Sequence, residues 1–264
     1  MKVLWLTDVH LDFPDANGLE RFYRKLEKAT ADAILISGDI GQAPTVIEFL
    51  RQIQIAAQCP VYFVFGNHDY YYGSIASVRA QAARVFTSGP IKYASLAGII
   101  PLTQTVCCVG HDGWGDSRNG NFLGSNVLLN DFELISELAG LPKLSLQKKL
   151  MQLGDEATMH LRTVLPDALA AFQHVILLTH VPPFPESAWW QGKPSGSDFL
   201  PFFSCKAMGD VLMEFIQKYP KKQMTVLCGH THGSGIARIL PNLIVYTGSA
   251  RYGYPKIQKS FIWE

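Results

Sequence analysis

The chain has 264 residues, of which 48% are apolar and 17% are charged, and its formal net charge is +1. This length suits a single α/β domain over residues 1–264, and the near-neutral charge gives no reason to expect bulk attraction to nucleic acid or to an anionic membrane. No apolar run reaches about 18 residues, which argues against a membrane span.

Short apolar runs rich in Val, Ile and Leu predict seven strands. Helices are predicted between the early strands, for example over Gly18–Thr30 and Pro44–Ala57. Continuous apolar runs are typical of strands covered on both faces, and their alternation with helices is typical of an α/β layer structure. The predicted strands are Val3–Leu6, Ala33–Ile36, Val61–Phe65, Val106–Val109, Val175–Leu178, Thr225–Cys228 and Leu243–Tyr246.

Two long segments interrupt this alternation. Gly113–Asn130 is rich in Gly and Asn and precedes helical sequence over residues 131–165, and Val181–Ala207 is rich in Pro, Gly and aromatic residues. Long loops in compact domains are often lids or binding loops. Because both segments begin at strand ends, we expect them to wall a site, with simple surface padding as the alternative.

Seven side chains able to bind metal stand at the ends of five of these runs. Residues two apart in an extended segment point the same way, so Asp8 can share an ion with His10, and His230 with His232. A carboxylate can bridge two cations, which makes Asp39 a candidate bridge. The donor set suits Mn²⁺, Fe²⁺/Fe³⁺ or Zn²⁺ rather than Ca²⁺. We therefore predict two metal ions, and the candidate ligands are Asp8, His10, Asp39, Asn67, His180, His230 and His232.

These motifs, in this order, resemble the motif series of the calcineurin-like metallophosphoesterases. The resemblance runs from residue 8 to residue 232 and implies a four-layer α/β/β/α sandwich of two mixed sheets flanked by helices. It also implies that His68 is a catalytic, non-ligand histidine and that Asp69 orients it. The matching segments are Asp8-x-His10, Gly38-Asp39, Gly66-Asn67-His68-Asp69, His180 and Gly229-His230-Thr231-His232.

The resemblance assigns the ligands to two ions that share Asp39. Two such ions can clamp a phosphate ester and supply a hydroxide that attacks phosphorus in line, with His68 assisting the leaving oxygen. Protein Ser/Thr phosphatases carry an arginine after the second motif, which is absent from Ile40-Gly41-Gln42. The first ion would be held by Asp8, His10, Asp39 and His232, and the second by Asp39, Asn67, His180 and His230.

We expect a hydrolase of a small phosphodiester or phosphomonoester. A nuclease is the alternative, but the chain lacks a basic stripe. A scaffold without activity would be expected to have lost ligands, and all seven are present. The five cysteines show no CxxC spacing and no signal peptide precedes the first strand, so we expect reduced thiols in a cytoplasmic protein.

Substrate contacts are less specific in the sequence. His111 and Asp112 end a predicted strand and could line the substrate pocket or form only a turn. Arg118 and Arg251 are candidates for binding phosphate oxygens, with an ordinary surface arginine as the alternative. The sequence leaves the natural ester, the native metal pair and the oligomeric state open.

Overall fold

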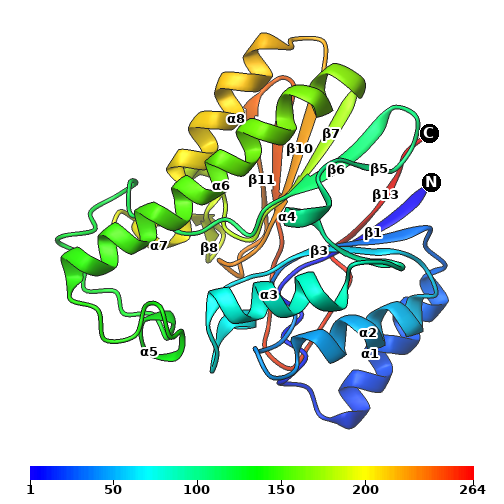
Figure 1. Ribbon diagram of the computed structural model, residues 1–264, viewed down its shortest axis with the longest axis horizontal. Coiled ribbons are helices and arrows are strands. Elements are labelled where there is room, and N and C mark those ends of the chain that lie inside the picture. The colour runs from blue at the N-terminus through cyan, green and yellow to red at the C-terminus, as the bar shows by residue number, and fades with distance from the viewer.

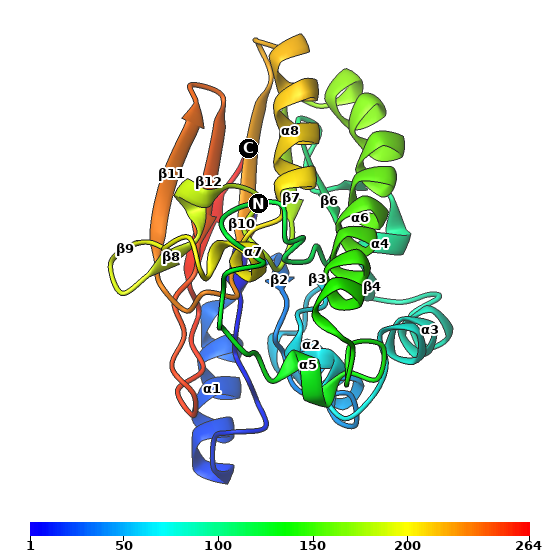
Figure 2. The same cartoon turned by 90° about the vertical axis from the view of Figure 1, so that its left-hand side faces the viewer.

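The computed structural model describes all 264 residues and stacks two mixed sheets between two helical layers (Figures 1 and 2). The five-stranded sheet has the order β13-β1-β2-β3-β4, and the six-stranded sheet has the order β11-β12-β10-β7-β6-β5. Helices α6 and α8 cover the second sheet, and α1, α2 and α3 lie beside the first (Figure 1). The predicted four-layer sandwich is confirmed.

The first sheet comes from the start and the end of the chain. Its inner strands pair in parallel, and β13 pairs antiparallel to β1. The elements of this half are β1 (Lys2–Leu6), α1 (Ala16–Ala29), β2 (Ala33–Ser37), α2 (Val46–Ala57), β3 (Val61–Val64), α3 (Ile75–Val85), β4 (Ile91–Tyr93), α4 (Ala94–Ala97) and β13 (Lys259–Ile262).

The second sheet comes from the middle of the chain. Its central strands β6, β7, β10 and β12 are parallel, with an antiparallel strand at each edge. The elements are β5 (Ile100–Pro101), β6 (Val106–Gly110), α5 (Asp131–Leu134), α6 (Lys143–Ala171), β7 (His174–Leu178), β8 (Trp189–Trp190), β9 (Lys193–Pro194), α7 (Leu200–Phe203), α8 (Lys206–Lys218), β10 (Gln223–Cys228), β11 (Gly235–Leu240) and β12 (Leu243–Thr247).

Alternation along each central strand divides the apolar side chains between two cores. In β1, Val3 and Trp5 pack between the sheets, whereas Leu4 and Leu6 pack toward the helices. Strand β7 does the same, since Ile176 and Leu178 face the first sheet. Side chains on successive residues of a strand point to opposite faces. The continuous apolar runs of the sequence are therefore explained by burial on both faces.

All seven predicted strands occur, each within two residues of the predicted bounds. The helical sequence over 131–165 is two helices, α5 and the longer α6, and the segment that separates them ends in Gly140-Leu141-Pro142. All five cysteines are buried and free, as expected. None of the helices has the length and apolar character needed to cross a membrane.

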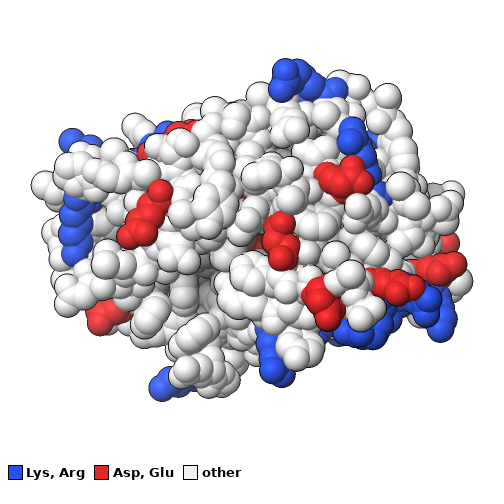
Figure 3. Space-filling model, turned by 90° about the horizontal axis from the view of Figure 1, so that it is seen from below, with Lys and Arg blue, Asp and Glu red and all other residues white.

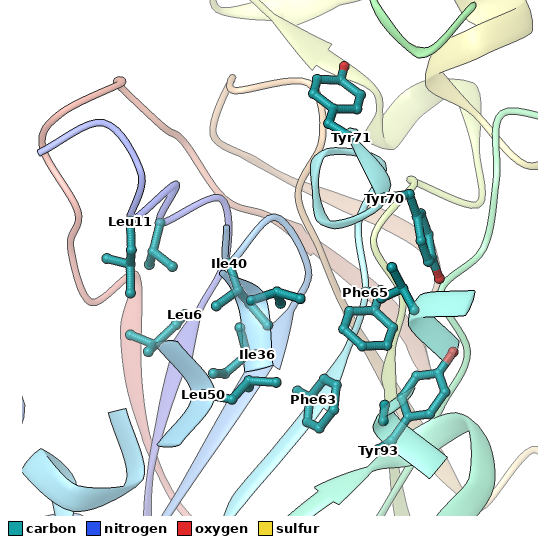
Figure 4. Packing of buried hydrophobic residues seen from close by; sticks show 14 of the residues in the cluster. Leu6, Leu11, Ile36, Ile40, Leu50, Phe63, Phe65, Tyr70, Tyr71 and Tyr93 are labelled. Atoms are coloured by element: carbon teal, nitrogen blue, oxygen red, sulfur yellow. The ribbon is translucent and has the colours of Figure 1, made fainter. Parts of the chain in front are cut away.

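The carboxyl ends of the parallel strands gather at one end of the sandwich. Short elements of the two long loops lie there, including α5, α7 and β8, and this end faces the viewer in Figure 2. Behind it the core is aromatic: Tyr70 and Tyr93 point their hydroxyls toward one another, whereas Tyr71 points away from the cluster (Figure 4). Ligand sites in such sheets lie beyond the carboxyl ends of the strands.

Candidate metal centre and its pocket

The seven predicted ligands converge from both sheets. Each follows the carboxyl end of β1, β2, β3, β7 or β10 by two to four residues. The ring of His180 joins the sheets, because its Nδ1 lies 2.9 Å from the carbonyl oxygen of Ser37 at the end of β2. Asp8, His10, Asp39, Asn67 and His180 are buried, and His230 and His232 are partly buried.

One group consists of Asp8, His10, Asp39 and His232, whose ligand atoms all lie within 4.8 Å of one another. Nε2 of His10 is 3.1 Å from Nε2 of His232 and 3.7 Å from Oδ2 of Asp39. Nε2 of His232 is 3.5 Å from Oδ1 of Asp8. Two imidazole nitrogens and two carboxylates at such separations form a donor set suited to a divalent transition metal.

The second group is built around Oδ1 of Asn67. This oxygen lies 3.0 Å from Nε2 of His180 and 3.0 Å from Nδ1 of His230. Its orientation is fixed, because Nδ2 of the same amide donates to Oδ1 of Asp131 at 2.8 Å. Asp39 adjoins this group as well, with Oδ1 3.3 Å from Nε2 of His180.

The tautomers of both histidines direct lone pairs toward Asn67. A neutral ring carries one proton, and when that proton is donated to a backbone carbonyl, the other ring nitrogen is left as an acceptor. For His180 the donor is Nδ1, which faces Ser37, and for His230 it is Nε2, which lies 3.1 Å from the carbonyl of Phe202. Three acceptors then converge with no hydrogen between them when both rings are neutral. A cation fits that position.

Protonation of the two rings differs. Burial holds the pKa of His230 at about 3, so its ring is neutral at pH 7. Burial acts in the same direction on His180, but the charges of Asp39 and Asp8 and the hydrogen bonds to Asp39 and Ser37 together outweigh it and raise the pKa to about 10. Without an ion a proton on His180 bonds to Asp39, and metal binding would displace that proton.

The backbone of these ligands is unusual. Ten non-glycine residues have positive φ, and five of them are the candidate ligands Asp8, His10, Asp39, His230 and His232. Such a conformation costs about 1–2 kcal/mol for a residue with a Cβ. Gly66 and Gly229 allow the closest approaches, because a Cβ on Gly66 would overlap Oδ1 of Asp39 and one on Gly229 would overlap Oδ2 of Asp8.

A pocket of about 290 Å³ opens over these residues. Both long loops contribute to its wall, Leu128 from the first and Trp190 and Phe203 from the second, together with Tyr252 from the segment after β12. A smaller cavity behind Asn67 holds about 10 Å³. No lysine or arginine is among the residues that line either space.

A model of the family described as calcineurin-like phosphoesterase matches residues 1–234. The chain belongs to this family. A UDP-2,3-diacylglucosamine hydrolase from Shewanella sp. (strain ANA-3) is 27% identical over 118 residues, which cover 40% of this chain and 42% of that protein. The alignment thus spans less than half of the length of this relative.

Solved structures share the fold across nearly the whole chain. The Phosphopantetheinyl Hydrolase from Mycobacterium tuberculosis has a TM-score of 0.67 at 12% identity, covering 96% of this chain and 90% of that one. A dimetal phosphatase from Danio rerio has a TM-score of 0.58 at 12% identity, covering 94% and 87%. At these identities the likeness shows the fold alone.

The phosphoesterase motif places His68 at the pocket, but Asp69 has another role than expected. His68 lines the pocket, and its Nε2 is 3.4 Å from the hydroxyl of Tyr252. Nδ1 of His68 has no hydrogen-bond partner. The carboxylate of Asp69 instead accepts the amides of Ile40, Gly41 and Gly66 at 2.8–2.9 Å. It therefore fixes the turns that carry Asp39 and Asn67, and does not orient His68.

His111 and Asp112 do not line the pocket, contrary to the expectation. The carboxylate of Asp112 is buried and accepts from the hydroxyls of Tyr70 and Tyr93 at 2.7 and 2.6 Å and from Arg79 at 2.9 Å. His111 lines a separate hollow beside α3 and α6. Their position at a strand end was the only reason to expect them in the pocket. Asp112 instead has a structural role, because its carbonyl also accepts the amide of His180 at 2.8 Å.

Arg118 and Arg251 also lie outside the residues that line the pocket. The guanidinium of Arg118 is held by Asp116 at 3.1 Å and Asp155 at 2.7 Å. That of Arg251 lies over the ring of Tyr254, 4.2 Å from its centroid. Neither cation is directed at the predicted phosphate position.

Two pocket residues have no signal in the sequence. Asp131, at the start of α5, is buried and accepts from Asn67 and, at 2.7 Å, from the hydroxyl of Tyr71. Tyr252 reaches His68 from a loop after the last motif. Neither stands at a strand end, and the loop conformations that deliver them depend on tertiary contacts.

Proposed function

We propose that the protein is a metal-dependent phosphohydrolase that cleaves a small phosphodiester or phosphomonoester. The observation that carries the proposal is the convergence beside Asp39 of one ring nitrogen each from His180 and His230 on Oδ1 of Asn67, at 3.0 Å in both cases. Together with the cluster of Asp8, His10, Asp39 and His232, this provides donor sets for two ions that share one carboxylate. Mn, Fe or Zn suit these donors.

Two bound ions would lower the pKa of water and offset the charge that develops on phosphate oxygens. The residues of the chain hold the reacting groups in place. Asp39 would hold both ions, and its Oδ1 accepts the amide of His68 at 2.9 Å. This bond ties the imidazole of His68 to the ligand framework.

His68 is the proposed general acid. Its ring packs against Tyr71, with centroids 4.2 Å apart, and its Nε2 points to Tyr252 at the pocket. A histidine there can pass a proton to a leaving alkoxide, which general acid catalysis by histidine accelerates by about 10²–10⁴. Asp69 takes no part in that transfer, since its oxygens bind backbone amides.

Nucleic acid fits the site less well. Binding to a phosphate backbone needs a basic stripe. On the face seen in Figure 3, acidic and basic side chains are interspersed and no continuous basic band crosses it. The pocket itself has no lysine or arginine in its lining.

The proposal is tested with metal-stripped protein that is reloaded with Mn²⁺, Zn²⁺ or Fe²⁺ and assayed on a bis-aryl phosphate, an aryl phosphate and a cyclic nucleotide. Metal-dependent release of product from at least one ester is expected. If none is hydrolysed although two ions are bound, the protein is a scaffold that keeps the fold and the donor sets without the activity.

A further inference from the structure

An apolar groove adjoins the pocket over the candidate metal centre. This groove has a volume of about 490 Å³ and lies along the first long loop and the start of α6. Leu128 lines both spaces, and Phe132 and Phe202 line both the groove and the small cavity behind Asn67. The other apolar residues of the groove are Phe122, Val127, Leu141 and Leu146.

Several of these apolar side chains are left uncovered. Leu128 is 88% exposed and Leu141 is 36% exposed, and Trp190 at the pocket is 37% exposed. Single exposed apolar residues are ordinary, but a contiguous set beside a site is typical of a ligand groove. The one cation of the groove, Lys143, is occupied, because its Nζ donates to the carbonyls of Leu123 and Ser125 at 2.7 and 2.8 Å.

Charge limits the phosphate that the pocket suits. A phosphomonoester carries nearly two negative charges at pH 7, and proteins hold such dianions with arginine or lysine as well as metal. Here no lysine or arginine lines the pocket, and the walls opposite the metal ligands are Trp190, Phe203 and Leu128. A diester carries one charge and presents a carbon substituent where the third oxygen of a monoester would lie.

From these features, and resting on the proposed phosphohydrolase activity, we infer that the substrate is a phosphodiester with an extended apolar substituent that occupies the groove. Its phosphate lies at the metal centre, and the apolar chain passes Leu128 and follows the groove toward Leu141. The ester oxygen that leaves is the one next to His68. Selection among diesters thus depends on the two loops, and the absence of lysine and arginine from the pocket disfavours a dianionic monoester.

The experiment compares 4-nitrophenyl phosphate with its methyl and octyl diesters, all below their critical micelle concentrations, on the Mn²⁺-loaded protein. Burial of a methylene is worth up to about fourfold in affinity. We expect kcat/KM for the octyl diester to exceed that for the methyl diester by at least about tenfold, through KM, and both diesters to exceed the monoester.

Leu141→Asp tests the groove, because Leu141 lines the groove but not the metal pocket. In this variant the ratio of kcat/KM for the octyl diester to kcat/KM for the methyl diester should fall toward one. Ile55→Asp is the matched control, since Ile55 is 61% exposed on α2 and lines neither space. It should keep the ratio of the unmodified protein.

Binding is measured separately by calorimetry with metal-stripped protein, where the octyl diester should bind and the methyl diester should not. Hydrolysis with no dependence on chain length, together with equal binding of both diesters, would overturn the groove assignment. Faster turnover of the monoester would overturn the diester assignment. Failure to cleave any ester with two ions bound, while the octyl diester still binds, would refute the proposed activity and leave the groove standing.

Discussion

The role of Asp131 in fixing the amide of Asn67 gives the sharpest prediction. In Asp131→Ala the Nδ2 of Asn67 loses its 2.8 Å acceptor, and the amide is free to turn that nitrogen toward His180 and His230. A hydrogen bond to a charged acceptor is worth about 1.5–3 kcal/mol, which corresponds to about 10–100-fold. Partners that orient metal ligands have effects of the same size.

The assay is calorimetric titration of metal-stripped protein with Mn²⁺. Only the ion held by Asn67 should bind more weakly in Asp131→Ala, while the ion held by His10 and His232 should keep its affinity. Asp131→Asn retains an acceptor oxygen and should lie in between. Tyr71→Phe is the comparison, because it removes the hydroxyl that donates to Asp131 and accepts from Nδ2 of Asn67 at 3.3 Å but leaves the shorter 2.8 Å bond between Asn67 and Asp131, so it should weaken binding less than Asp131→Ala does.

Two results would refute this reasoning. Unchanged affinity for both ions in Asp131→Ala would mean that packing alone orients Asn67. Equal weakening of both ions would mean that the substitution disturbs the whole site, and a shift in thermal unfolding would accompany it.

Further predictions concern residues that act on chemistry, metal and stability. His68→Ala should lower turnover by about 10²–10⁴ with both ions still bound; loss of metal on elemental analysis would make His68 a ligand. Asp39→Asn should empty at least one metal site, and full occupancy would exclude Asp39 as the bridge. Asp112→Ala should cost about 3–5 kcal/mol of unfolding free energy, since it leaves Arg79 without its buried partner. Burial opposes ionisation of Asp112, but Arg79 and the tyrosines lower its pKa below the usual value. The stabilisation that ionised Asp112 gives to the folded state is therefore present above about pH 4 and is lost as pH falls through the folded-state pKa. A denaturation series from pH 3 to pH 7 should therefore show the cost of Asp112→Ala shrinking toward acid, and a constant cost would contradict the ion pair.

The fold could be predicted where the sequence pattern was strong. The central strands are buried on both faces, so their apolar runs are continuous and the positions of β1, β2, β3, β7 and β10 follow from them. Edge strands lack such continuous apolar runs and are harder to recognise in the sequence. β11 has a single buried residue among exposed and partly buried ones, β13 has no buried residue, and β4 has only three residues, so none of them was predicted.

The helices α3 and α8 were also missed, for different reasons. α3 is rich in alanine, which gives little contrast between its faces. α8 begins at Lys206, at the end of a segment interpreted as loop, although its buried Met208, Leu212 and Ile216 have helical spacing.

Site residues that follow central strands could be predicted from the sequence, whereas those from loops could not. Residues that follow a parallel strand are brought together by the sheet itself, which is why Asp8, Asp39 and His180 could be placed from sequence. Asp131 and Tyr252 come from loops, where the chain path depends on contacts far apart in the sequence. A strand end is also an imperfect signal, since Asp112 stands at one and serves the core.

The left-handed backbone at the candidate ligands restricts which residue types can replace them. Among residues with a Cβ, Asp, Asn and His enter that conformation most readily, whereas β-branched and bulky residues are strained there. Asp8, His10, Asp39, His230 and His232 are all of the tolerated types. Exchange of a candidate ligand for a β-branched or bulky residue therefore adds backbone strain to the loss of the donor atom. Backbone geometry and metal chemistry select the same short set of amino acids, and each limits change in the other.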